Sequence, residues 1–342
     1  MTTTITLSDL LSTSVRIIRD GQAPTGAYIA SPNFPEYRFS WLRDGSFIAL
    51  GMDAAGQRDS AAAFHGWAAR AISGRRRQID DLVVRLERGE QVSVDEMLPT
   101  RYTLDGEIEE VIGEAWPNFQ LDGYGTWLFA LHSHLTGAGA TRPVSADPVE
   151  HRESVELAAR YLAASWRMPC FDYWEEFGDR RHTSTLAAIA AGLRAAARML
   201  DEPRYDAVAD AVLGDILATC VHDGSFGKGP DDARVDGSLV SIATPFALVP
   251  VDHPVMAATA RRIHDELTSP SGGIRRYLGD TYYGGNPWLL LTAWLGWHDR
   301  RAGDAASADR ALAWVLAHAN AAAALPEQLL DEPQSPQHVQ EW

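Results

Sequence analysis

The chain has 342 residues, of which 46% are hydrophobic and 22% charged, a balance that excludes a disordered or collagen-like protein. Its 46 acidic and 30 basic side chains give a formal net charge of -16, so we expect no nucleic acid and no anionic membrane among its partners. The length allows one large domain or two of ordinary size.

The N-terminal sequence MTTTITLSDLL has neither the basic region nor the apolar core of a signal peptide. No stretch of the chain reaches the roughly 18 uninterrupted apolar residues that a membrane helix needs. Cys170 and Cys220 are too few for a disulfide framework, and we expect both to be buried thiols. These features predict a cytoplasmic protein.

Apolar residues recur at steps of three and four along most of the chain, for example at Leu186, Ile189 and Leu193, and this spacing predicts α-helices. Alanine is abundant in the same segments, which favours helices over strands. Between them, segment 222–238 is expected to be a long loop, and residues 331–342 a C-terminal tail. The expected helices, in chain order, span residues 7–19, 43–55, 58–88, 120–136, 148–166, 183–200, 204–220, 238–248, 253–268, 286–299 and 304–323.

Two kinds of helix alternate in this order. Segments 123–135 and 286–299 are apolar nearly all round and suit inner positions, whereas 58–88 and 253–268 carry charge on one face and suit outer positions. Six such hairpins would take about 57 residues each, enough for two helices of about 15 residues and their loops. We therefore predict a single all-α domain over residues 1–342, an (α/α)6 barrel of six inner and six outer helices.

Loops before several inner segments are rich in aromatic and acidic residues, and a barrel would bring them together at one end. Hydrolysis of a glycosidic bond needs one carboxylic acid to protonate the leaving oxygen and a second carboxylate to activate water or to attack. Glu175 and Glu176 follow Trp174, and repulsion and desolvation there would keep one carboxyl protonated near neutrality. The same residues would also suit the start of a helix. Glu327, after Pro326, is the second candidate, although such a residue often only caps a turn.

Arg43 and Asp44 place a bidentate donor beside an acceptor at the start of an apolar helix, which is what sugar hydroxyls require. An ion pair with an N-cap at the helix entry explains the same two residues equally well. Arg275, Arg276 and Asp280 form a second cluster that leaves the same two interpretations open.

Other chemistries lack their residues. The sequence contains no HExxH, CxxC, GxSxG or Walker motif, which disfavours a zinc peptidase, a redox protein, an α/β-hydrolase and a P-loop enzyme. His132 and His134 are two positions apart on an expected helix and so point to different sides, which disfavours a shared metal ion. The run from Arg75 to Arg77 is expected to be a solvated helix end. We expect neither a metal nor a cofactor.

Five clusters occur in a fixed order along the chain. They are Tyr37-x3-Trp41-x-Arg43-Asp44, Trp116-x3-Gln120-x-Asp122-Gly123, Trp174-Glu175-Glu176, Arg276-Tyr277-x2-Asp280-Thr281-Tyr282-Tyr283-x-Gly285-Asn286-Pro287-Trp288 and Glu327-Gln328. Taken together they resemble glycoside hydrolase family 15, the glucoamylase family. The match covers most of the chain, from Tyr37 to Glu327.

The resemblance implies an (α/α)6 barrel and an inverting exo-glucosidase that removes one glucose from a non-reducing end as the β-anomer. It implies that Glu175 is the general acid, that Glu327 is the general base, and that Tyr37 helps to position the attacking water. An inverting pair stands about 6.5–9.5 Å apart to admit this water, which requires two carboxylates from different segments.

The resemblance also implies which residues hold the sugar. Arg43 and Asp44 would bind the outermost hydroxyls of the terminal glucose, with help from Arg276, while Glu176 and Trp116 would contact the sugar in or beside the leaving-group site. The other motif residues expected to line the substrate site are Trp41, Asp122, Trp174, Asp280 and Trp288.

The sequence carries neither the β-sandwich nor the starch-binding module of many relatives, and we expect it to act on short, soluble oligosaccharides. Isomaltose and isomalto-oligosaccharides are expected first, α-1,4 substrates of the maltose type second and trehalose third. The alternative to an enzyme is a non-catalytic regulator that binds sugar on a degenerate version of the same barrel. The loss of one catalytic carboxylate would indicate such a protein. An epimerase or polysaccharide lyase would leave Glu175 and Glu327 unexplained.

Overall fold

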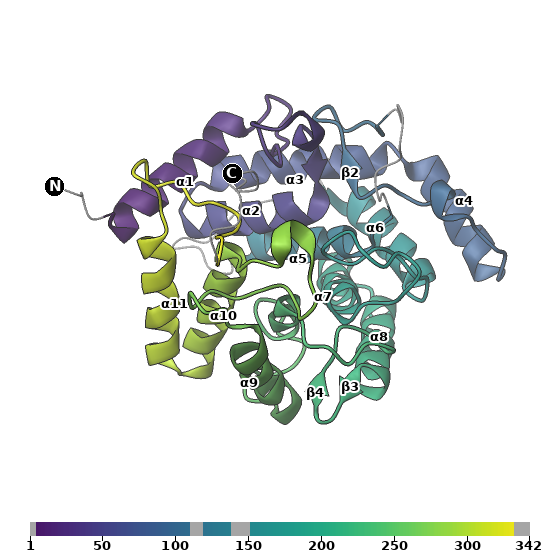
Figure 1. Cartoon of the computed structure of the whole chain (residues 1–342). Coiled ribbons are helices and arrows are strands. Elements are labelled where there is room, and N and C mark those ends of the chain that lie inside the picture. Colours follow the sequence, from purple (N-terminus) through teal and green to yellow (C-terminus); the bar gives the residue numbers. More distant parts are fainter. Residues whose placement is uncertain (1–4, 110–118, 138–150, 332–342) are drawn as a thin grey trace. The chain divides into compact units, whose positions relative to one another are not determined.

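The computed structural model describes residues 5–109, 119–137 and 151–331 (Figure 1). These residues are mostly helical, as predicted. The strands named in this part of the chain are only two residues long, and they form the antiparallel pairs β1 (Ser40–Trp41) with β2 (Arg101–Tyr102) and β3 (Val221–His222) with β4 (Ser225–Phe226). No helix in the described ranges combines the length and the apolar composition needed to cross a membrane.

The chain divides into two compact units. Residues Ile17–Asp215 form one, here called the central unit, and Met1–Arg16 with Ile216–Trp342 form the other, the terminal unit. The single domain over residues 1–342 stays a prediction.

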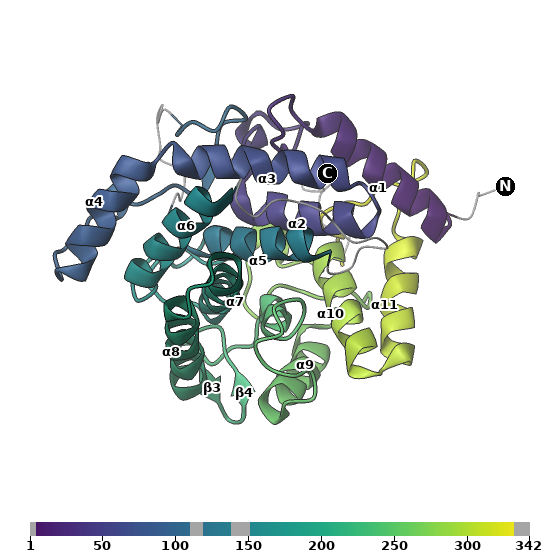
Figure 2. The ribbon, with the colours of Figure 1, turned by 180° about the vertical axis from the view of Figure 1, so that it is seen from behind.

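Three helices of the central unit pack side by side, with α5 between α2 and α7 (Figure 2). The helices α5 and α7 are buried on nearly all sides, as the apolar periodicity predicts. Amphipathic helices pack outside them, with α3 on α2 and α6 on α7. The helices of this unit are α2 (Leu42–Ala54), α3 (Arg58–Ser73), α4 (Arg76–Glu87), α5 (Asp122–Thr136), α6 (Arg152–Ser165), α7 (Thr183–Leu200) and most of α8 (Arg204–Thr219), with the short 3-10 helices η1 (Pro35–Tyr37) and η2 (Val94–Glu96).

Two side-chain pairs show that α2 and α5 run in the same direction. Near the N-termini of both helices, Arg43 Nη1 donates to Asp122 Oδ2 over 3.0 Å. Near their C-termini, His134 Nδ1 lies 2.9 Å from Asp53 Oδ2. Because like ends are joined to like ends, the charged side chains of both N-termini face the same end of the central unit.

The close contact between α5 and α7 depends on glycine. A Cβ on Gly125 would lie 2.3 Å from the carbonyl oxygen of Ala188, and a Cβ on Gly192 would lie 2.5 Å from the carbonyl oxygen of Gly125. Both contacts are with backbone atoms, which cannot rotate away as a side chain would. The small residues therefore set the distance between the two helices.

We expect Gly125→Ala to destabilise the protein by about 1–3 kcal/mol, the usual cost of overpacking a core. Urea unfolding followed by circular dichroism measures this free energy. Gly214 on α8 is the matched control, because a Cβ there meets nothing within 4 Å. Gly214→Ala is expected to be neutral or to stabilise by up to about 1 kcal/mol, since alanine is the better helix former. Equal effects of both substitutions would contradict this account of the packing.

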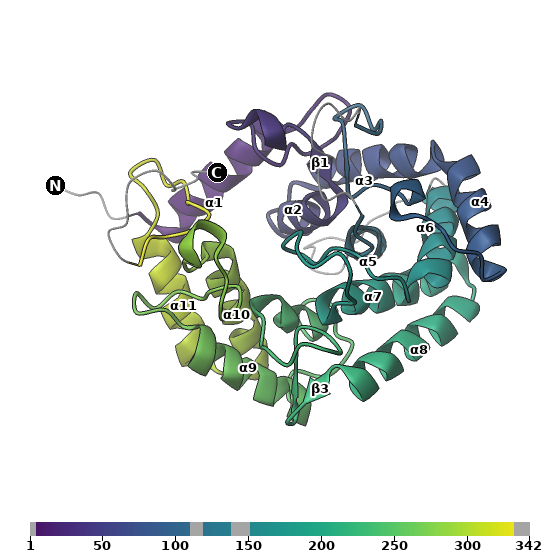
Figure 3. The same cartoon turned by 45° about the vertical axis from the view of Figure 1, so that its right-hand side comes forward.

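The terminal unit pairs α10 with α11 (Figure 3). Both α10 and α9 pack on the 3-10 helix η4. Its elements are the N-terminal part of α1 (Leu7–Gly21), then β3 and β4, η4 (Gly237–Ile242), α9 (Pro254–Leu267), η5 (Tyr282–Gly284), α10 (Leu289–Ala302) and α11 (Ala305–Ala317). Cys170 in the central unit and Cys220 in the terminal unit are both buried thiols that form no disulfide, as expected.

Three expected helices were wrong in extent. Segment 58–88 is two helices, α3 and α4, because Gly74, a poor helix former, ends the first. In segment 238–248 only η4 is helical, because Pro245 lacks the N–H that a continuing helix needs. The helix expected over 304–323 ends at Ala317, and beyond it the Asn320 side chain accepts the N–H groups of Ala322 and Ala324 in a turn.

Segment 222–238 was expected to be a loop throughout, but it includes the hairpin partner β4. Residues 148–150, where one helix was expected to begin, lie outside the described part of the chain, and so does residue range 332–342 of the expected tail.

Candidate active site

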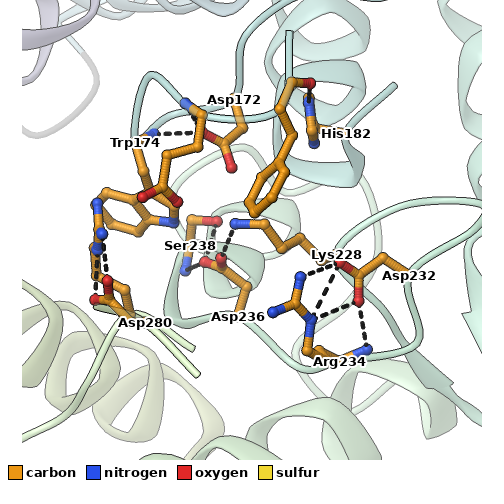
Figure 4. Close-up of polar contacts among 12 residues, drawn as sticks. Asp172, Trp174, His182, Lys228, Asp232, Arg234, Asp236, Ser238 and Asp280 are labelled. Atoms are coloured by element: carbon orange, nitrogen blue, oxygen red, sulfur yellow. Dashed lines mark hydrogen bonds and ion pairs between the residues drawn. The ribbon is translucent and has the colours of Figure 1, made fainter. Parts of the chain in front are cut away.

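The Trp174-Glu175-Glu176 sequence lies in a turn before α7 and does not begin a helix. The Asp172 side chain holds this turn, because its Oδ1 accepts the N–H groups of Trp174 and Glu176, each over 2.9 Å (Figure 4). Glu175 itself has a φ of 63°, a left-handed conformation that few residues other than glycine adopt. Such conformations persist where the surroundings fix them, and they are common at functional sites.

The Glu175 carboxylate is held by Trp41. The indole Nε1 of Trp41 donates to Glu175 Oε1 over 2.7 Å, and Trp41 is only 4% exposed. Tyr37 packs against the indole with ring centroids 6.2 Å apart, and the Arg101 guanidinium lies over it at 5.1 Å. The donor is therefore fixed in place, and it favours the ionised form of the carboxyl that it contacts.

Arg43 is the centre of the polar network at the start of α2. Its Nη1 donates to Gln120 Oε1 and Asp122 Oδ2, each over 3.0 Å, while Asp44 lies 3.7 Å from its Nε. Burial lowers the pKa of Arg43, but the carboxylates of Asp122, Asp44 and Glu175 together raise it above its ordinary value. The guanidinium thus stays charged.

The two aspartates beside Arg43 differ in exposure. The Asp122 side chain is fully buried and serves to orient the guanidinium, whereas the Asp44 side chain is 45% exposed. The pair of Arg43 and Asp44 thus offers a rigid donor and an accessible acceptor.

Two supporting residues were missed as site residues by the sequence reasoning. The fully buried Gln120 accepts from Arg43, and its Nε2 donates to the carbonyl of Asp172. It thereby connects the start of α5 with the turn that carries Glu175. A signal for Asp172 was present, since an aspartate two positions before Trp174 is typical of a turn closed by its own side chain.

Glu327 lies on an extended segment beside the start of α10. The N–H of Leu289 donates to the carbonyl of Glu327 over 3.2 Å, and Trp288 and Gln328 form an antiparallel β-bridge. Main-chain bonds therefore position Glu327 beside the start of α10.

Asp331 fixes the end of the same segment. Arg275 Nη2 donates to Asp331 Oδ2 over 2.6 Å, and the Asp331 N–H donates to Asn286 Oδ1 over 3.3 Å. Burial raises the pKa of Asp331, but hydrogen bonds from Ser271, Arg275 and Ser269 bring it below its ordinary value. Asp331, the first residue of the predicted tail, is thus firmly held.

Arg276 and Asp280 form a buried bidentate pair, with side chains 2% and 1% exposed. Arg276 Nε donates to Asp280 Oδ2 over 2.7 Å, and Figure 4 labels Asp280 with its dashed contacts. The N–H of Tyr282 donates to Asp280 Oδ1 over 2.9 Å. The guanidinium lies 4.8 Å from the Tyr282 ring centroid and 5.6 Å from that of Trp288. Gly285 closes this loop with a φ of 67°, where a Cβ would lie 2.4 Å from the Asp280 carbonyl oxygen.

The family of the chain follows from its match to known proteins. The model of the glycosyl hydrolases family 15 matches residues 11–335. The chain belongs to glycosyl hydrolase family 15. An isomaltose glucohydrolase of Kribbella flavida is 40% identical to it over 343 residues, covering 98% of this chain and 86% of that protein.

Solved structures agree with the family. A glycosidase variant in complex with glucose superposes with a TM-score of 0.87 at 38% identity, covering 98% of this chain and 89% of the other. A bacterial glucoamylase complexed with acarbose reaches a TM-score of 0.73 at 20% identity, covering 94% of this chain and 51% of the other, and shows the fold alone. The predicted family, the all-α (α/α)6 barrel fold and the assignment as a glycoside hydrolase are confirmed.

The family 15 motif residues fall into both units. The central unit brings Trp41 to Glu175 and Arg43 to Asp122, with Tyr37, Asp44, Trp174 and Glu176 in the same segments, and the terminal unit brings together Arg276, Asp280, Trp288 and Glu327. Trp116 lies outside the described residues.

Proposed function

We propose that this glucosidase removes single glucose units from the non-reducing ends of isomaltose and short isomalto-oligosaccharides, with inversion at the anomeric carbon. The observation that carries the proposal is the 40% identity to an isomaltose glucohydrolase over 98% of this chain. The retention of glutamates at positions 175 and 327 supports catalysis and not a non-catalytic regulator.

The chemistry requires two carboxyl groups with opposite protonation. Glu175, as general acid, gives a proton to the glycosidic oxygen as the bond from this oxygen to C1 breaks. Glu327, as general base, takes a proton from a water whose oxygen bonds to C1 from the opposite face, which leaves β-glucose. Tyr37 helps to orient this water. An inverting pair needs a separation of about 6.5–9.5 Å, so we expect this distance between the two carboxyl groups.

Binding of the terminal glucose needs donors and acceptors in fixed positions. Arg43 and Asp44 bind its outer hydroxyls, and the rigidity of Arg43 comes from its bonds to Gln120 and Asp122. Arg276 assists and is fixed in the same way by Asp280. The remaining contacts are assigned to Trp116, Trp174, Glu176 and Trp288.

The test is a panel of α-glucosides differing in linkage, with glucose release followed by proton NMR. Isomaltose, panose and dextran, maltose, and trehalose represent the three linkages. We expect the highest kcat/KM on isomaltose and β-glucose as the first product. No glucose from any substrate would overturn the proposed activity, and α-glucose as the first product would overturn inversion. A preference for maltose or trehalose would overturn the linkage.

The Trp41→Phe variant tests the contact to the proposed acid. It removes the indole N–H that Glu175 Oε1 accepts and keeps an aromatic ring. Since this donor favours the ionised carboxylate, its loss should raise the pKa of Glu175. The alkaline limb of the kcat profile is then expected to move to higher pH, because the acid keeps its proton longer.

Full pH profiles of kcat for the wild type and Trp41→Phe measure this shift. Tyr102→Phe is the matched control, because the Tyr102 hydroxyl is buried and bonds to Tyr124 in the same unit. The control should leave the alkaline limb in place. A shift to lower pH in Trp41→Phe would contradict the assignment.

A further inference from the structure

One imidazole of the central unit is buried without a hydrogen bond to any residue that the structure describes. His65 on α3 is fully buried, and neither of its ring nitrogens has a hydrogen-bond partner among the described residues. Buried polar groups are nearly always paired, so each exception requires a physical explanation. The His65 ring lies beside that of His134, with centroids 5.1 Å apart.

Two further ligand-type groups converge on this imidazole. Asp53 near the end of α2, His65 and His134 near the end of α5 are all buried, and each offers one potential ligand atom within 4.8 Å of the others. Asp53 Oδ2 and His134 Nδ1 are 2.9 Å apart. Two ligands with bonds of about 2.0–2.2 Å to one tetrahedral ion stand roughly 3.3–3.6 Å apart, so an ion would replace the hydrogen bond of this pair and widen it by about half an ångström.

We propose that Asp53, His65 and His134 bind one divalent transition-metal ion of the zinc type. Two imidazoles and one carboxylate suit Zn²⁺ or Co²⁺, whereas Mg²⁺ and Ca²⁺ prefer oxygen ligands throughout. The three residues come from three helices, and the ion would join α2, α3 and α5. The sequence reasoning considered His134 only with His132 and did not find this cluster.

A guanidinium borders the cluster, and an ion would have to share the Asp53 carboxylate with it. Arg58 Nη1 lies 3.6 Å from Asp53 Oδ1, and the Arg58 side chain is bonded through Nη2 to the His134 carbonyl at 2.8 Å.

The position of the cluster predicts a structural role. Asp53 is ten residues from Arg43 along α2, which at helical rise is about 15 Å from the sugar-binding end. The ion would fix the C-terminal ends of the two parallel helices whose N-termini carry Arg43 and Asp122. We therefore expect binding to raise the melting temperature and to leave the chemistry of hydrolysis unchanged.

The test uses the full chain after removal of metals with EDTA. Zn²⁺ is then added in excess, unbound Zn²⁺ is removed by gel filtration, and the bound Zn²⁺ is measured by mass spectrometry. In a parallel sample Co²⁺ is titrated, and its visible absorption reports nitrogen and oxygen ligands. We expect about one ion per chain, no comparable binding of Mg²⁺ or Ca²⁺, and an increase in melting temperature on metal addition. These readouts do not depend on activity, so a negative result would overturn the metal site and leave the proposed function unaffected.

Two ligand variants and two controls assign the site. His65→Gln is expected to weaken Co²⁺ binding by at least about 100-fold, since loss of outer hydrogen-bond partners alone costs 10–100-fold. Asp53→Asn serves the same purpose if His65→Gln does not fold. Two variants are controls and should bind Co²⁺ as the wild type does. His132→Gln changes a histidine on the same helix, α5, and His264→Gln removes another histidine that contacts an aspartate, Asp299.

Every outcome bears on the proposal. Retention of one Zn²⁺ that is lost in His65→Gln or Asp53→Asn supports it. Failure of the wild type to retain Zn²⁺ overturns it, and so does binding that the ligand variants leave unchanged or that either control abolishes.

Discussion

Replacement of Glu175 by glutamine is expected to lower kcat on isomaltose by roughly 10² to 10⁴-fold, which is the usual contribution of a general acid. Glutamine keeps the size of the side chain, and its carbonyl oxygen can still accept the Trp41 N–H. It has no acidic proton to give to the leaving sugar, which is a poor leaving group without one. Initial rates of glucose release give kcat and KM, and KM should change little.

A second substrate separates the loss of the acid from damage to the site. α-Glucosyl fluoride releases fluoride, which needs far less protonation than a sugar alkoxide, so Glu175→Gln should retain most of the wild-type rate on it. Glu176→Gln, next to it in the same turn, is the matched control and should change KM more than kcat. Equal losses of Glu175→Gln on both substrates would contradict the role of the acid.

The pH profile follows from the same assignment. The acid must be protonated and the base ionised, so the kcat of the wild type should be bell-shaped with an acidic to neutral optimum. On the fluoride, Glu175→Gln should lose the alkaline limb and keep the acidic one, which belongs to Glu327. A flat wild-type profile between about pH 4 and about pH 8 would contradict both assignments.

The helices that the sequence predicts best are those whose packing agrees with local preference. The helix expected over 183–200 is observed as α7 with the same bounds, because leucine, isoleucine and alanine occupy helical spacing throughout. Segment 238–248 is equally apolar, but only the 3-10 helix η4 forms there, and Pro245 has no N–H with which to continue it. The apolar periodicity correctly predicts that both segments are buried. It predicts an α-helix in both, and this is observed only for 183–200.

The site was predictable in its residues and not in the network that holds them. Motif spacing points to Arg43 and Glu175, but Gln120 bonds to a turn 52 positions away in the chain, which no local pattern indicates. The left-handed conformation of Glu175 likewise depends on the hydrogen bonds that Asp172 accepts from the turn. Sequence reasoning finds residues whose chemistry is needed and misses those that only position them.

Replacement of Glu327 by glutamine is expected to reduce kcat by roughly 10² to 10⁴-fold on isomaltose and on α-glucosyl fluoride alike. The attacking water must lose its proton whichever group leaves, so the better leaving group gives no rescue. The fold should not suffer, because glutamine keeps the size of the side chain and the Glu327 carbonyl still accepts the N–H of Leu289. Glu266→Gln on α9, whose carboxylate pairs with Arg262, is a control for the loss of one negative charge and should keep full activity.

Azide then tests the direction of attack. With Glu327 as the proposed base, its shortening in Glu327→Ala should leave space beside the anomeric carbon, and the azide anion needs no base to act as a nucleophile. With α-glucosyl fluoride we expect recovery of a measurable part of the rate, with β-glucosyl azide as the product by proton NMR. Attack from the face opposite the leaving group requires this anomer. Formation of the α-azide, or full activity of Glu327→Gln without azide, would show that the base lies elsewhere.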